Sequence, residues 1–261
     1  MFFVQVVIAI AVAASALASA RKLLQTDGGD FALITEHPHQ VSIEYAGRHI
    51  CGGSIVTSRF VITALHCLAD RNATADMVSI RAGTALLGQG GTVHQVDKIV
   101  CHDKYARRGP GLAPINDLAG LRIAGDGFKF DETRQPVKLF KAGDKLEDGD
   151  RAQLTGWGGE NASQCASVQQ LRMIELTVIN STFCNETYWK DFEGIGEGQV
   201  CALARVNKDS CQADGGAPLM VGGKLAGIFS WGKGCETSGW PDVFTGVAAF
   251  RAWIDEHLLT L

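Results

Sequence analysis

The sequence lacks several features that would point to a specialised class of protein. Only 6 of its 261 residues are proline, and we find no internal repeat, heptad run or low-complexity tract. Lysine and arginine do not gather into a run, and the formal net charge is −4. This charge gives no electrostatic reason to expect nucleic acid or an anionic membrane as a partner. What remains is an ordinary globular composition, 46% hydrophobic and 20% charged.

Long hydrophobic runs are also missing, except at the start of the chain. Met1 to Ala20 is apolar, carries no charged side chain and ends in the small residues Ala18-Ser19-Ala20. We interpret residues 1–20 as a signal peptide, residues 21–25 as a candidate pro-segment and residues 26–261 as the globular part. A transmembrane anchor is the alternative, but the Ala/Ser-rich second half is too weakly apolar to complete a span of roughly 20 residues.

The cysteines and glycosylation motifs agree with export. The chain has 8 cysteines, which suit a compartment where disulfides persist. Four Asn-X-Ser/Thr motifs, typical of glycosylated surface loops, begin at Asn72, Asn161, Asn180 and Asn185. We therefore predict a secreted, extracellular glycoprotein.

Short strands separated by turn residues dominate the remaining pattern. Leu219 to Ser230 is typical of a hairpin with Gly222-Gly223 at a two-residue turn. Helical patterns are confined to a short turn near Ser181–Tyr188 and to the C-terminus, where apolar residues recur at helical spacing from Phe250 to Leu258. The pattern predicts an all-β barrel or sandwich. The other candidate strands are His39–Tyr45, Met77–Arg81, Gln95–Cys101, Leu118–Ile123, Ala152–Gly156, Leu171–Ile179 and Val200–Ala204.

Two segments carry residues suited to nucleophilic catalysis. The first runs from Cys51-Gly-Gly-Ser to Ala-Leu-His66-Cys67, where a disulfide would fix an imidazole able to act as a base. The second is Asn116-Asp117-Leu118-Ala119, a carboxylate that enters an apolar strand. A buried Asp117 can hold the far nitrogen of His66 and select its tautomer.

A third segment completes a resemblance. Asp209-Ser-Cys-Gln-Ala-Asp-Gly-Gly-Ala-Pro-Leu219 is followed by Ser230-Trp231-Gly232-Lys-Gly-Cys235, and Gly156-Trp157-Gly158 precedes both. Together these segments resemble the chymotrypsin/trypsin family of secreted serine proteases, the system on which the general description of the catalytic triad is based. The resemblance covers about Thr26 to Leu259.

This resemblance implies two packed antiparallel six-stranded β-barrels with a cleft between them and a short C-terminal α-helix. It places the boundary between the barrels near residues 131–145. It also implies the disulfides Cys51–Cys67, Cys184–Cys201 and Cys211–Cys235. Cys101 and Cys165 have no implied partner, so they pair with each other or one of them is a free thiol.

The nucleophile is the main departure from the family pattern. The family has Gly-Asp-Ser-Gly-Gly-Pro where this chain has Ala213-Asp214-Gly215-Gly216-Ala217-Pro218. His66, Asp117 and Gly215 thus stand at the triad positions, and glycine has no side chain to attack a carbonyl. Ala213 and Gly215 stand at the oxyanion-hole positions, where Ala213 replaces a glycine. Ser210 is a nearby hydroxyl, but the resemblance puts it in the wall of the specificity pocket.

The activation segment departs as well. The family creates an Ile-Val-Gly-Gly terminus whose amine pairs with the Asp before the serine, whereas this chain has Gln25-Thr-Asp-Gly-Gly29 there. We therefore expect Asp214 to lack its usual amine partner, which is costly for a buried carboxylate.

The residues of the expected binding cleft depart less from the family pattern than the nucleophile and the activation segment do. Asp209 and Ser210 correspond to the specificity pocket, and Ser230-Trp231-Gly232 to the segment that pairs with a substrate backbone. Asp242 stands where the family usually has a pocket-lining glycine, so it narrows the pocket or makes it doubly acidic.

Metal and cofactor sites are not indicated. His37-Pro38-His39 has two alternate imidazoles but no nearby Cys or carboxylate ligand, which makes a poor metal site. The loop from Ala82 to Gln95 contains no Asp or Glu, so it lacks the oxygen ligands that calcium needs. We predict no cofactor and no metal.

Three functions agree with these residues. The first is a monomeric, non-catalytic homologue that binds a protein or an extended basic peptide, or protease inhibitors, as a regulator or decoy. The alternative is a secreted trypsin-like endopeptidase with residual or unusual activity. The third is a storage, venom-like or digestive protein with no specific partner.

Overall fold

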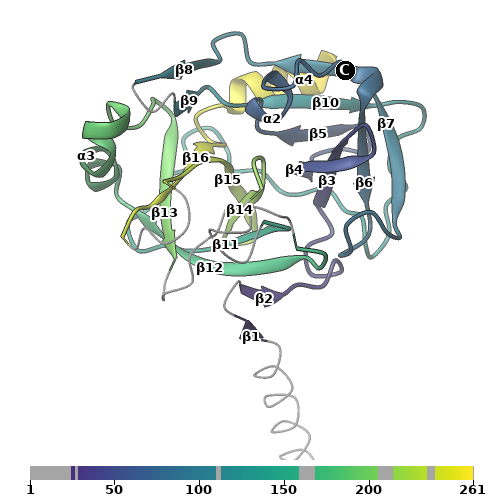
Figure 1. The fold of residues 1–261 in the computed structure, drawn as a ribbon, viewed down its shortest axis with the longest axis horizontal. Coiled ribbons are helices and arrows are strands. Elements are labelled where there is room, and N and C mark those ends of the chain that lie inside the picture. Colours follow the sequence, from purple (N-terminus) through teal and green to yellow (C-terminus); the bar gives the residue numbers. More distant parts are fainter. Residues whose placement is uncertain are drawn as a thin grey trace, which may run out of the picture.

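The structure analysed is a computed structural model that describes residues 25–26, 29–109, 113–158, 168–204, 214–233 and 239–260. It consists mainly of strands arranged as two groups side by side, together with three short helices (Figure 1). The predicted signal peptide lies outside the described residues. So do Asn161, Cys165 and the segments that contain Asp209, Ser210, Cys211, Ala213 and Cys235.

The first barrel is closed and comes from the first half of the chain. Its core is formed by inward-facing branched side chains that alternate along the strands, such as Val41, Ile43 and Ile80, all fully buried. The strands follow the spatial order β10-β5-β4-β3-β6-β7. They are β3 (Gln40–Tyr45), β4 (Arg48–Ile55), β5 (Phe60–Thr63), β6 (Val78–Ala82), β7 (Thr92–Cys101) and β10 (Ala119–Ile123).

The second barrel comes from the second half of the chain. Its six strands are joined in the order β12-β11-β14-β15-β16-β13, and the pairing of β13 with β12 closes the ring. Two short strands, β1 (Gln25–Thr26) and β2 (Gly29–Phe31), extend the sheet beyond β12. The six are β11 (Arg151–Gly156), β12 (Arg172–Ile179), β13 (Gln199–Ala204), β14 (Pro218–Val221), β15 (Lys224–Trp231) and β16 (Asp242–Gly246). The predicted pair of six-stranded antiparallel barrels is confirmed.

The predicted hairpin is also confirmed. β14 and β15 pair antiparallel across a two-residue turn, with Val221 opposite Lys224. Gly222 and Gly223 have φ values of +55° and +73°, the left-handed conformation that such a turn needs and that glycine adopts without strain.

Helices are more numerous than predicted. The C-terminal helix α4 (Arg251–Thr260) is present and buries Ile254 against the first barrel. The short turn expected near Ser181–Tyr188 is the 12-residue helix α3 (Ser181–Phe192), and the four-residue helix α2 (His66–Ala69) was not predicted at all. A 3₁₀ turn over Ala75–Met77 also forms. Helix α2 and the 3₁₀ turn are not predicted from the sequence because helical periodicity is visible only over longer segments.

The links between the barrels are packed. Leu225 in β15 exchanges backbone hydrogen bonds with the connection that follows the first barrel, accepting from Phe140 N at 3.0 Å and donating to Lys138 O at 2.7 Å. A hairpin of β8 (Ala106–Arg108) and β9 (Ala113–Ile115) reaches across, with Ala113 in the apolar cluster of the second barrel. Among the described residues, no helix is both long enough and apolar enough to cross a membrane.

Candidate functional site

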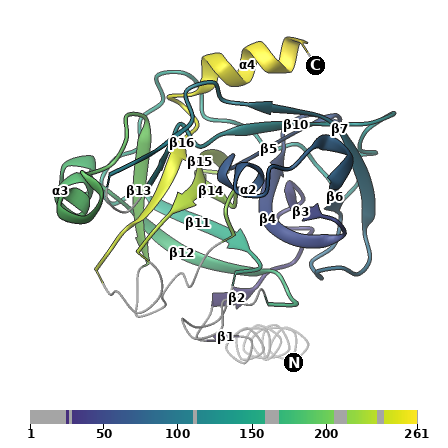
Figure 2. The ribbon, with the colours of Figure 1, turned by 45° about the horizontal axis from the view of Figure 1, so that its top comes forward.

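His66 and Asp117 form a close pair at the junction of the barrels. His66 opens helix α2, which lies between the two groups of strands in Figure 2. Its Nδ1 lies 2.7 Å from Asp117 Oδ2, and its backbone N–H donates to Oδ1 at 2.8 Å. One carboxylate therefore fixes both the ring and the backbone of His66, which is the arrangement that orients an imidazole as a base.

The second barrel holds this carboxylate in place. Ser230 in β15 donates its hydroxyl to Asp117 Oδ2 at 2.5 Å, and Thr245 in β16 donates to the Asp117 backbone carbonyl at 3.0 Å. Asp117 is fully buried, so these bonds replace the water that a buried charge loses. The pair is thus assembled from both barrels.

Gly215 lies directly against the imidazole. Its backbone carbonyl accepts from Gly52 N at 2.9 Å, which ties it to strand β4. A Cβ built on Gly215 would lie 2.4 Å from His66 Nε2 and 2.9 Å from Cys67 Sγ. The imidazole therefore occupies the space that a side chain at position 215 would need. The next glycine, Gly216, has φ +79°, and a Cβ there would meet Thr63 Oγ1 at 2.1 Å.

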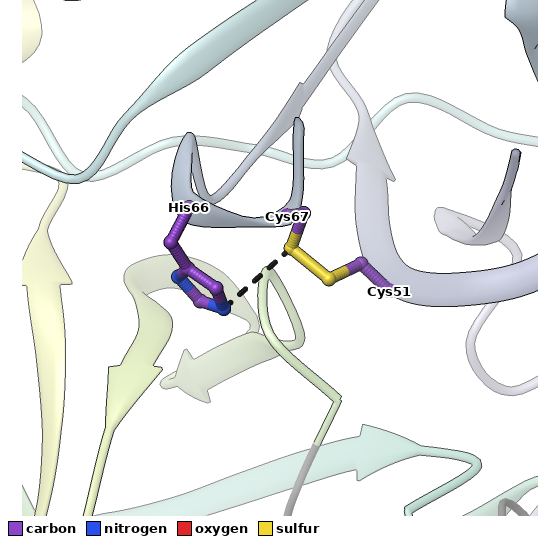
Figure 3. A group of neighbouring side chains, drawn as sticks. All are labelled: Cys51, His66 and Cys67. Carbon is purple, nitrogen blue, oxygen red and sulfur yellow. Dashed lines mark hydrogen bonds between the residues drawn. A yellow bond between two sulfur atoms is a disulfide. The ribbon is translucent and has the colours of Figure 1, made fainter. Parts of the chain in front are cut away.

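His66 also lies beside a disulfide. Figure 3 shows its ring pointing toward the bond between Cys51 and Cys67, with Nε2 3.7 Å from Cys67 Sγ. Ligand atoms of these three residues lie within 4.8 Å of one another. Both sulfurs are joined in the disulfide, however, and metal ligation requires a thiolate. The group is therefore not a metal site.

Asp214 has a partner that the sequence analysis did not foresee. Its Oδ1 lies 3.0 Å from His49 Nε2, and its Oδ2 accepts from Trp157 N at 2.5 Å. The other nitrogen of His49, Nδ1, lies 2.8 Å from Ser42 Oγ. Asp214 is therefore a buried carboxylate that pairs with an internal imidazole from the first barrel, which reduces the cost of its burial.

The segment expected to bind a peptide backbone is largely covered. The Trp231 ring is 8% exposed and packs against Tyr188 and Phe192 of α3, with ring centroids 4.7 Å and 4.9 Å away. Its ring is thus a core element, and a partner at this segment would meet the backbone. Asp242 is also buried, and its Oδ1 lies 2.7 Å from the position of a Cβ on Gly232. The carboxylate therefore lies directly against Gly232, in the space that a side chain there would need.

Two of the three expected disulfides fall among the described residues, and both are present: Cys51–Cys67 and Cys184–Cys201. The pairing of Cys211 with Cys235 stays a prediction. Cys101 is exposed and forms no disulfide with any residue in the described part of the chain.

Three of the predicted glycosylation sites can be placed. Asn72 is exposed in a left-handed turn after α2. Asn180 caps α3, its Oδ1 accepting from the backbone N–H groups of Thr182 and Phe183. Asn185 Oδ1 accepts from Ile195 N at 3.0 Å. The use of these asparagines as glycosylation sites stays a prediction.

The two histidines weighed as metal ligands are buried. The rings of His37 and His39 lie 6.3 Å apart, edge to face, and no third donor joins them among the residues with known placement. His39 Nε2 has no hydrogen-bond partner there. Burial, with a smaller contribution from His37, lowers the pKa of His39 to about 4. His39 is therefore a neutral core residue at neutral pH.

This depressed pKa predicts an acid-sensitive fold. The folded state resists protonation of His39 until about pH 4, whereas the unfolded chain takes up the proton near pH 6.5, so stability is complete above 6.5 and falls as the pH drops. Between pH 7 and pH 4.5 the free energy of unfolding should fall by about 2.5 kcal/mol more in the wild type than in His39→Phe. Urea denaturation at both pH values measures this difference. Equal losses of stability in the wild type and in His39→Phe would contradict the lowered pKa of His39.

The sequence analysis missed His49, Ser42 and Thr245. His49 stands two residues before Cys51, in the same strand as the first motif, but nothing local indicates a partner 165 positions away. Only the crossing of the two barrels brings the groups together.

Comparison with known proteins agrees with this geometry. The trypsin family model matches residues 26–254. Trypsin delta of Drosophila erecta is 33% identical over 227 residues, covering 87% of this chain and 86% of the relative. Trypsin alpha-4 of Lucilia cuprina is also 33% identical, over 87% and 85% of the two chains. Among solved structures, neuropsin, a serine protease expressed in the limbic system of mouse brain, superimposes with a TM-score of 0.77 at 28% identity, covering 88% of this chain and 98% of neuropsin. This chain therefore belongs to the trypsin family of serine proteases.

Proposed function

We propose that this chain is a secreted, non-catalytic member of the trypsin family that binds a protein or an extended peptide, protease inhibitors included, as a regulator or decoy. The observation that carries the proposal is Gly215, which offers no nucleophile beside His66 Nε2. Losing the serine of a related triad costs on the order of 10⁶ in turnover. Secretion is supported by the apolar leader and the disulfides.

No neighbouring hydroxyl in the described site replaces the missing one. Ser230 donates to Asp117 on the opposite side of the imidazole from Nε2, and Thr63 donates to the Gly52 carbonyl at 2.7 Å. Both hydroxyls are buried and already engaged, so neither is placed to attack a substrate.

The intact His66–Asp117 pair favours a second candidate, an endopeptidase with residual activity. A water molecule activated by His66 could hydrolyse a peptide slowly. General-base assistance alone is worth about 10²–10⁴-fold, far below the effect of a full triad. This candidate therefore predicts weak turnover that depends on His66.

The binding mode that fits the structure uses the backbone of Ser230–Gly232 and nearby carboxylates. Because the Trp231 ring is buried, an extended peptide would add to the main chain there, as in strand addition. The carboxylate of Asp242 beside Gly232 supplies negative charge that favours a basic side chain on that peptide, and Asp209 is predicted to add a second carboxylate. The ligand class is thus an extended, lysine- or arginine-containing segment.

The proposal is tested by combining an activity assay with a binding assay. We expect the purified chain to show no hydrolysis of lysyl or arginyl peptide amides and no covalent labelling by a serine-directed organophosphorus reagent. It should bind a fluorescent hexapeptide of alternating lysine and alanine saturably. Turnover that disappears in His66→Ala, or covalent labelling, would establish the enzymatic alternative. Absence of both turnover and peptide binding would reject the peptide-binding proposal.

A further inference from the structure

A contact suited to a cation lies directly after the segment that is expected to bind a peptide backbone, and a lysine of the chain itself occupies it. Lys233 directly follows Gly232, and its Nζ lies 3.5 Å above the centre of the Trp240 ring. The same Nζ donates to Asp191 Oδ2 at 2.6 Å. An aromatic face and a carboxylate thus hold one ammonium group, the combination that recognises cations in proteins.

The platform under this ammonium group is rigid. The Trp240 ring packs edge-on against Tyr188, with centroids 5.1 Å apart, and Tyr188 packs in turn against Trp231. The Tyr188 hydroxyl donates to the Pro241 carbonyl at 2.5 Å, which fixes the chain next to Trp240. The aromatic face is therefore formed by the fold and does not depend on Lys233.

The lysine, by contrast, is loosely held. Its side chain is 32% exposed and the Asp191 side chain is 48% exposed. Exposed ion pairs contribute little to stability, and exposed cation–π contacts are similarly weak. The ammonium group can therefore leave at small cost, whereas the Trp240 ring stays packed against Tyr188 and Asp191 stays next to it on α3.

We propose that Trp240 and Asp191 form a binding site for a lysine or arginine side chain of a partner, and that Lys233 closes this site as an internal competitor. The inference deepens the proposed function, on which it rests for the idea of a basic peptide. A peptide that runs along Ser230–Gly232 reaches this site next, because Lys233 continues the same segment. The partner must therefore displace Lys233 before its own basic side chain can bind.

The test compares a variant that lacks the Lys233 ammonium group with a control variant that lacks another exposed lysine. Lys233→Met keeps most of the side-chain volume and frees the ring and the carboxylate. Lys190→Met removes the same charge from an exposed position on α3, and among the described residues the cation above the Trp240 ring is Lys233 and not Lys190. The wild type and both variants are titrated with the lysine–alanine hexapeptide and with N-acetyl-lysine amide, and the Trp240 indole resonance is followed by NMR.

We expect Lys233→Met to bind both probes about tenfold more tightly than the wild type, as for a site that is closed in roughly nine of ten molecules. Lys190→Met should change either affinity by less than about twofold, the effect of an exposed charge alone. Adding Asp191→Asn to Lys233→Met should abolish the gain.

The outcomes separate this inference from the proposed function. If the wild type binds the hexapeptide but Lys233→Met and Lys190→Met behave alike, the internal competitor does not exist and the proposed function stands. If Lys233→Met binds N-acetyl-lysine amide more tightly while no protein binds the hexapeptide, the cation site stands and the peptide-binding function fails. If Lys233→Met binds neither probe, the cation site is overturned.

Discussion

Replacing Gly215 with serine is expected to leave the chain without trypsin-like turnover. A Cβ at this position would lie 2.4 Å from His66 Nε2 and 2.9 Å from Cys67 Sγ. The imidazole is tied to Asp117 through its ring and its backbone, and the sulfur is held in a disulfide. Space for the new side chain therefore opens only if the His66 ring shifts away from its position, and this ring is the base that a serine would need.

Two further residues, Ala213 and Asp214, are expected to limit the turnover of Gly215→Ser. Ala213 stands at a position where the family uses a glycine for an oxyanion-hole N–H, and loss of one such donor costs about 10²–10³-fold in turnover. Asp214 is bound to His49, whereas the family pairs this residue with a new amino terminus. We therefore expect kcat/KM of Gly215→Ser for a lysyl amide to stay at least about 10²-fold below that of an active trypsin.

The matched control is Gly215→Ala. It adds the same Cβ without a nucleophile, so it should lower the free energy of unfolding by an amount similar to Gly215→Ser, about 1–3 kcal/mol for overpacking. The double variant Ala213→Gly with Gly215→Ser separates the oxyanion hole from the steric effect. A single Gly215→Ser variant that turns over within tenfold of an active trypsin would show that the site needs only its serine.

The parts of the site that were predicted share one property. Each lies in a short sequence motif whose order and spacing match those of the family. His66, Asp117 and Gly215 were located in this way, and the structure brings all three together. The barrels were predictable because alternating side chains and glycine turns are local features of strands.

The parts that were missed depend on contacts between distant segments. The burial of Trp231 results from α3, whose 12 residues show too weak an apolar periodicity to predict more than a short helical turn from sequence. The partner of Asp214 comes from the other barrel. The spacing of residues in the sequence predicts neither the burial of Trp231 nor the His49–Asp214 contact, because both depend on how the barrels and helix α3 pack together.

Removing the imidazole of His49 is expected to destabilise the fold strongly. His49 and Asp214 are both nearly buried, with 8% and 6% of their side chains exposed. His49→Leu would leave the Asp214 carboxylate with the Trp157 N–H as its one hydrogen-bond partner among the residues that the structure describes, and would also remove the edge-to-face contact between His49 and the Trp157 ring. Removing one partner of such a buried pair costs about 3–5 kcal/mol.

A double-mutant cycle identifies the source of this cost. In an Asp214→Asn background there is no carboxylate to leave unpaired, so His49→Leu should cost only about 1–2 kcal/mol, the value of a lost neutral hydrogen bond with its packing. Urea denaturation of the four proteins measures the coupling. Equal costs in both backgrounds would mean that His49 acts only through packing against Trp157. A strong coupling would mean that this imidazole stabilises the buried Asp214 carboxylate, and with it the segment that holds Gly215, from within the fold.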